Sequence, residues 1–96
     1  MRVVDHGAGG APECMNITQA QLPVAGEDEV LIRVAAAGVN RPDILQRSGK
    51  YPPPAGASPY MGLEVAGEIV GVGSSVTQWK VGDTVCALTP GGGYAE

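Results

Sequence analysis

The stretch GVNRPDILQRSGKYPPPAGASPYMGLEVAG, residues 38–67, decides how this chain folds. Asn40 can cap a short helix over residues 41–47, because proline is tolerated in the first turn and Asp43 puts negative charge near the positive helix end. Gly49 follows where the helix should stop. Three consecutive prolines, residues 52–54, then stiffen the loop that follows. The stretch therefore predicts a two-turn helix and a stiff loop.

Alternating apolar segments lie on both sides of this helix and loop. In EVLIRVAAAGVN, residues 29–40, four apolar side chains share one face of a strand: Val30, Ile32, Val34 and Ala36. LEVAGEIVGVG, residues 63–73, predicts a second strand. Shorter strands are expected in MRVVD, CMNITQAQLP and TVCAL, residues 1–5, 14–23 and 84–88. With 15 Gly and 8 Pro to supply turns, the chain is expected to be mainly β, a partly open barrel with one or two short helices.

Size and charge exclude several classes of protein. At 96 residues the chain is one domain at most. Its net charge is −4 and its Lys and Arg residues form no cluster, so a nucleic acid partner is not expected. No run has the roughly 20 apolar residues that span a bilayer, and the N-terminus lacks the apolar centre of a signal peptide. We therefore expect a cytoplasmic protein with no membrane partner.

Cysteine and histidine give no metal framework. Cys14 and Cys86 lie far apart and form no CxxC pair, so neither a zinc site nor a disulfide scaffold is indicated. Both are expected to be buried or half-buried free thiols, because free cysteine behaves as a small hydrophobe. His6 stands alone beside a glycine-rich turn, where a surface or capping role is expected.

Four motifs occur in a characteristic order and spacing: EVLIRVAAAGVNRPDILQRSGKYPPP, GLEVAGEIVGVGSSV, VGDTVCAL and GGGYAE. Together they resemble the N-terminal catalytic domain of the medium-chain dehydrogenase/reductase superfamily. Within it the chain looks most similar to the zinc-free NADPH:quinone oxidoreductases, including the p53-inducible subgroup. The resemblance covers nearly the whole chain.

This resemblance implies a GroES-like barrel followed by a Rossmann domain that binds the nicotinamide cofactor. No strand in the chain leads into a G-x-G-x-x-G motif that opens a helix, and GVGSS, residues 71–75, is expected to be a turn. Residues 1–96 are therefore expected to be a fragment, the GroES-like N-terminal catalytic domain. The full-length protein would be a homodimer.

The resemblance also bears on zinc. Alcohol dehydrogenases of this superfamily hold a catalytic zinc with a Cys and a His, at the positions that Asn40 and Leu63 occupy here. Amide and aliphatic side chains cannot replace thiolate and imidazole as zinc ligands. No metal is therefore expected.

The resemblance implies NADPH as the cofactor, held mainly by the Rossmann domain, with Asn40 facing the nicotinamide ribose or the emptied metal pocket. Tyr51 would be catalytic, donating a hydrogen bond to a substrate carbonyl oxygen as negative charge develops. Asp43 and Glu64 would line the substrate pocket with it. Simpler roles stay open: Asn40 as N-cap alone, Asp43 as a helix-dipole residue, and Glu64 as a structural hydrogen-bonding residue.

Two aromatic residues, Trp79 and Tyr94, are expected to be core or interface residues that need partners for their polar edges. The function favoured is reduction of a small quinone or similar activated carbonyl compound by hydride transfer, with the isolated fragment inactive. The alternatives are an enoyl-thioester reductase, a zinc-type alcohol dehydrogenase relative, and a GroES-like interaction module that is no enzyme. The last is disfavoured because such a module has no reason to carry NRPDILQRSGKYPPP.

Overall fold

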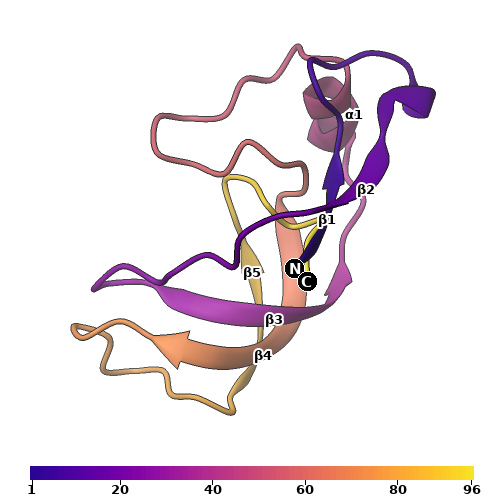
Figure 1. The fold of residues 1–96 in the computed structure, drawn as a ribbon. Coiled ribbons are helices and arrows are strands. Elements are labelled where there is room, and N and C mark those ends of the chain that lie inside the picture. The colour runs from indigo at the N-terminus through magenta and orange to yellow at the C-terminus, as the bar shows by residue number, and fades with distance from the viewer.

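The computed structural model describes all residues, 1–96, as two small antiparallel sheets and two short helices (Figure 1). The elements are β1 (Arg2–Asp5), the 3₁₀ helix η1 (Pro12–Cys14), β2 (Asn16–Gln19), β3 (Val30–Ala37), α1 (Arg41–Arg47), β4 (Glu64–Val72) and β5 (Thr84–Leu88). One sheet pairs β1 with β2, and the other has the order β3-β4-β5. The predicted mainly β class with short helices is confirmed. Neither helix has the length and apolar character needed to span a bilayer.

The C-terminal segment joins the two sheets. The backbone N–H of Val4 donates to the Tyr94 carbonyl oxygen at 2.9 Å, and the N–H of Glu96 donates to Arg2 at 3.1 Å. From the other sheet, the N–H of Val34 donates to the Glu96 carbonyl oxygen at 3.0 Å. The two chain ends consequently lie side by side (Figure 1). This segment therefore hydrogen bonds to both sheets, which remain separate and leave the barrel partly open.

The long strands β3 and β4 pair with two irregularities, between Leu31 and Ile32 and between Val34 and Ala36. The strands approach so closely that a Cβ on Gly67 would lie 2.1 Å from the Arg33 carbonyl oxygen. The prediction that Val30, Ile32, Val34 and Ala36 share one apolar face of β3 is only partly right. The first three side chains are half-buried, but Ala36 is exposed. The register shift before Ala36 breaks the simple alternation.

The helix α1 confirms the prediction for residues 41–47, with Asn40 as N-cap and Ser48 as C-cap. Its first turn holds Asp43 and its last turn holds Arg47, both favourable to the helix dipole. The Arg47 Nε also donates to the Gly10 carbonyl oxygen at 3.1 Å, so the turn after β1 packs against the end of α1.

The core is small. Only Val3, Met61, Val65 and Ile69 are buried apolar side chains. The two cysteines are free thiols, as expected, and Cys14 is half-buried. Cys86 is exposed, which corrects the prediction that it is buried or half-buried. It lies on β5, an edge strand on which every second side chain faces solvent.

Candidate functional site

A polar pair forms where β3 leads into α1 and where β4 begins. The Asn40 Nδ2 donates to the Glu64 Oε1 at 3.1 Å. Both residues are exposed, and the second carboxylate oxygen of Glu64 accepts no bond within the chain. The pair can therefore offer a hydrogen-bond acceptor to a hydroxyl or amide group of a ligand.

The glycine before this pair makes room for it. A Cβ on Gly38 would lie 1.8 Å from the Glu64 Oε1 and 2.8 Å from its Cδ, closer than atoms can approach. The Gly38 N–H also donates to the Glu64 backbone oxygen at 2.9 Å. Glycine at position 38 thus lets the Glu64 carboxylate reach Asn40.

A buried carboxylate lies behind the pair. Asp43 is only 2% exposed, and its Oδ2 accepts two hydrogen bonds, from the Asn40 backbone N–H at 3.0 Å and from the Tyr94 hydroxyl at 2.5 Å. Its other oxygen, Oδ1, is buried without a partner. Burial, together with the hydrogen bond to Asp43, raises the pKa of Tyr94 from 10.0 to about 12. The Tyr94 hydroxyl therefore keeps its proton, and remains a donor, throughout the neutral range.

A second buried polar side chain on α1 holds the neighbouring loop. Gln46 is 5% exposed, and its Oε1 accepts the Gly62 backbone N–H at 3.0 Å. Gly62 has φ of +100°, and a Cβ there would lie 2.6 Å from the Tyr94 backbone nitrogen. Asp43 and Gln46, three residues apart on one helix face, thus fix the two chain segments that cross beneath α1.

Tyr51 stands apart from this cluster. It lies on the loop after α1, is 41% exposed, and hydrogen bonds to none of Asn40, Asp43 or Glu64. The structure thus brings together three of the four predicted site residues and leaves the Tyr51 hydroxyl free for a ligand.

The residues present do not fit a catalytic zinc ion. The two positions at issue hold Asn40, whose amide nitrogen donates to Glu64, and the aliphatic Leu63. No group of three or more His, Cys, Asp or Glu side chains gathers where it could hold a metal ion. A zinc ion would need ligands that this part of the chain does not offer.

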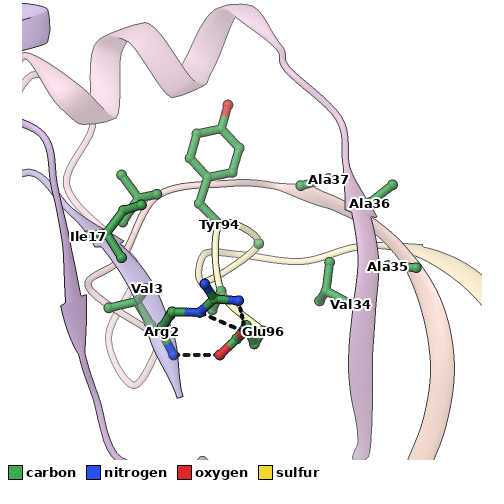
Figure 2. A pocket seen from close by; sticks show the side chains of 12 residues that line it. Arg2, Val3, Ile17, Val34, Ala35, Ala36, Ala37, Tyr94 and Glu96 are labelled. Carbon is green, nitrogen blue, oxygen red and sulfur yellow. Dashed lines mark hydrogen bonds and ion pairs between the residues drawn. The ribbon is translucent and has the colours of Figure 1, made fainter.

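An open hollow of about 280 Å³ lies between β1 and β3, beside the C-terminal segment. Figure 2 shows it, with Val34 to Ala37 on one side and Val3 and Ile17 on the other. Tyr94 is the one residue that lines the hollow and also belongs to the polar cluster. The Tyr94 hydroxyl is directed out of the hollow toward α1 (Figure 2). The lining of the hollow is mostly apolar but includes the Arg2–Glu96 ion pair, and the hollow is not the polar site.

Sequence reasoning missed the roles of Tyr94, Gln46 and Gly38. Tyr94 was expected to need a polar partner, but that partner lies 51 positions earlier in the chain. Gln46 carries one usable signal: it follows Asp43 by three residues, so both lie on the same face of the helix. Gly38 gave none, because its importance depends on where the Glu64 side chain folds back.

Comparison with known proteins agrees with this architecture. The family described as the alcohol dehydrogenase GroES-like domain matches residues 26–96. A quinone oxidoreductase of Pseudomonas aeruginosa is 43% identical over 94 residues, which are 97% of this chain and 29% of that protein.

Two solved structures that contain NADPH are also similar. A mycobacterial protein complexed with NADPH superposes with a TM-score of 0.81 at 32% identity, over 93% of this chain and 28% of its own. The Escherichia coli quinone oxidoreductase complexed with NADPH gives a TM-score of 0.74 at 35% identity, over the same shares of each chain. The chain thus spans less than a third of the proteins it matches.

Proposed function

Because the chain belongs to the alcohol dehydrogenase GroES-like domain family, we propose that residues 1–96 form the substrate-side catalytic domain of an NADPH-dependent oxidoreductase. The reaction proposed is hydride transfer to a quinone or a similar activated carbonyl compound, without zinc. The observation that carries the proposal is the 43% identity to a quinone oxidoreductase across 97% of the chain. The cluster of Asn40, Asp43 and Glu64 supports it, because these residues offer polar contacts but no metal ligands.

Asn40 and Glu64 are proposed to contact the cofactor. A ribose presents two neighbouring hydroxyl donors, and the exposed Glu64 carboxylate has an oxygen free to accept one of them. NADPH, when bound, supplies the hydride, and the protein contributes binding and orientation. Most of the cofactor-binding surface is proposed to belong to a Rossmann domain outside these residues.

Tyr51 is proposed to be the catalytic hydrogen-bond donor. Its hydroxyl is free of partners within the chain, and the prolines at positions 52–54 restrict the loop that holds it. A donor aimed at a carbonyl oxygen stabilises the negative charge that develops there during hydride transfer. Asp43 is proposed to hold the Asn40 backbone in place by a hydrogen bond and not to contact the substrate.

The test uses two proteins: the 96-residue chain, and an extended protein in which these residues are followed by the Rossmann domain. NADPH oxidation with a simple ortho-quinone should occur only in the extended protein. Tyr51→Phe should lower kcat by about 100-fold, the usual effect of losing one oriented donor, while Tyr60→Phe should leave the rate unchanged. Reduction of an enoyl thioester but not of the quinone would overturn the proposed substrate class.

A further inference from the structure

We propose that Tyr94 is a positioning residue, acting through Asp43 to hold the Asn40–Glu64 pair in place. Three hydrogen bonds form a continuous chain: from the Tyr94 hydroxyl to Asp43 at 2.5 Å, from the Asn40 N–H to Asp43 at 3.0 Å, and from the Asn40 Nδ2 to Glu64 at 3.1 Å. The inference rests on the proposed function for its effect on catalysis. The linkage itself rests only on this geometry.

Asp43 depends on Tyr94 because it has so few donors. A carboxylate that is 2% exposed is stable only when hydrogen-bond donors replace the lost water. Asp43 has two donors, both on Oδ2, and Oδ1 has none. Without the Tyr94 hydroxyl only the Asn40 N–H would remain, so the carboxylate would turn to recover solvent or a water molecule. Asn40 would then lose the acceptor that fixes its backbone.

Tyr94 is itself held firmly by its backbone. Its N–H donates to the Met61 carbonyl oxygen at 2.9 Å, and its carbonyl oxygen accepts the Val4 N–H at 2.9 Å. Gly62 lies so close that any side chain there would collide with the Tyr94 nitrogen and ring. These contacts fix the Tyr94 backbone from which the ring extends, and the hydroxyl points toward α1 (Figure 2). Tyr94→Phe should remove the hydroxyl while keeping the ring and the backbone.

The linkage is tested first in the 96-residue chain by NMR. In Tyr94→Phe, the backbone amide and side-chain NH₂ signals of Asn40 should shift. Exchange of its backbone amide with solvent should speed up by about 10-fold or more, because an amide whose acceptor is no longer held opens more readily. The matched control is Tyr60→Phe. The hydrogen bond from Tyr60 to the Ser58 hydroxyl comes from its backbone N–H, so removing the Tyr60 hydroxyl breaks no hydrogen bond. Unchanged Asn40 signals in Tyr94→Phe would overturn the inference whatever the protein's activity.

The catalytic consequence is tested in the extended protein. Tyr94→Phe should lower kcat/KM for quinone reduction by about 10-fold, since small misplacements of positioning groups have effects of this order or larger. In an Asn40→Ala background the same substitution should have no further effect, because the residue it positions is gone. An equal loss in both backgrounds would mean general destabilisation and overturn the positioning role. Absence of quinone reduction in the unsubstituted extended protein would contradict the proposed function, and the Asn40 signals would still decide the linkage.

Discussion

Glu64 is the residue whose environment says most about the site. Its carboxylate folds back over Gly38 and accepts a bond from Asn40, although it is exposed and could extend into solvent. An exposed hydrogen bond of this kind contributes little to stability. Its value lies in fixing the direction of two polar side chains that face the same solvent region.

Gly38→Ala should separate this pair without unfolding the chain. The added Cβ would occupy the place of the Glu64 Oε1, so the carboxylate must swing away from Asn40. The backbone at Gly38 does not have positive φ, and the free energy of unfolding should change by less than about 1 kcal/mol. The expected result is a shift of the Asn40 side-chain NH₂ signals with an almost unchanged urea midpoint.

Gly71→Ala is the matched control, because a Cβ there would meet only Leu31 at an ordinary 3.6 Å. It should leave the Asn40 signals in place. If Gly38→Ala also leaves them in place, the Asn40–Glu64 bond does not persist in solution.

Single residues were predictable from sequence where their role is local. Asn40 as N-cap and Asp43 as first-turn acid follow from neighbours within four positions, and the structure confirms both. The partner of Tyr94 and the exposure of Cys86 were not predictable, because each depends on which strands pair and at which edge. The catalytic role of Tyr51 stays a prediction.

At the scale of elements, α1 is a helix whose inward face is polar. Its two buried residues are Asp43 and Gln46, not aliphatic side chains. Seven residues are too few for a helix to be stable alone, so its contacts with the rest of the chain must hold it. Those contacts include the hydrogen bonds from Tyr94 and Gly62.

Gln46→Ala should therefore destabilise the fold more than an exposed glutamine does. The Gly62 N–H would lose its acceptor in a buried place, which costs about 1–3 kcal/mol of the free energy of unfolding. The measurement is the urea midpoint, compared with Gln78→Ala, whose side chain is exposed and makes no hydrogen bond. Equal midpoints for the two variants would show that the Gln46 bond is not needed.

The sequence predicted these elements well because their signals are local. Alternation and turn residues located β3, β4 and β5, and capping residues located α1. The strand expected at residues 14–23 is shorter, β2 being Asn16–Gln19, and Cys14 belongs to η1 instead. Pro12 favours a helical start there, and this local preference outweighs the strand pattern at Cys14.

For the whole molecule, the open barrel leaves much apolar surface in solvent. The accessible surface is 6164 Å², against about 5,100 Å² for a compact monomer of 9.7 kDa. Large side chains such as Trp79, at 49%, and Leu88, at 83%, are exposed. The excess of about 1,000 Å² is similar to what one partner buries in a standard interface.

The isolated chain should therefore self-associate. Sedimentation velocity over a range of concentrations should show dimers or larger species growing with concentration. The extended protein, with more of this surface covered, should show a single species over the same range. A stable monomer of the 96-residue chain at all concentrations would contradict the prediction.

Acid should weaken the closure between the chain ends. Hydrogen bonds from the Arg2 side chain and backbone lower the pKa of Glu96 from 4.5 to about 2. A lowered pKa in the folded state gives a stabilisation that is present above pH 4.5 and is lost as the pH falls through about 2. Glu96→Gln should thus be less stable than the unsubstituted chain near neutral pH, by a small margin that salt reduces.

That margin should shrink between pH 4.5 and about 2, which denaturant midpoints across this range would measure. Glu68→Gln is the control, because it removes an exposed ion pair with Arg33 that does not link the two ends of the chain. A margin for Glu96→Gln that does not change with pH would show that the Arg2 contact is not formed in solution.

The proposed reduction of quinones without zinc can be tested by removing any metal from the extended protein. The rate of NADPH oxidation by the extended protein with an ortho-quinone is measured before and after exhaustive treatment with a metal chelator, alongside elemental analysis. We expect the same rate in both samples and no zinc in the protein, because Asn40 and Leu63 offer no zinc ligand. Activity that disappears with the chelator and returns with zinc would contradict it, as would no quinone reduction at all.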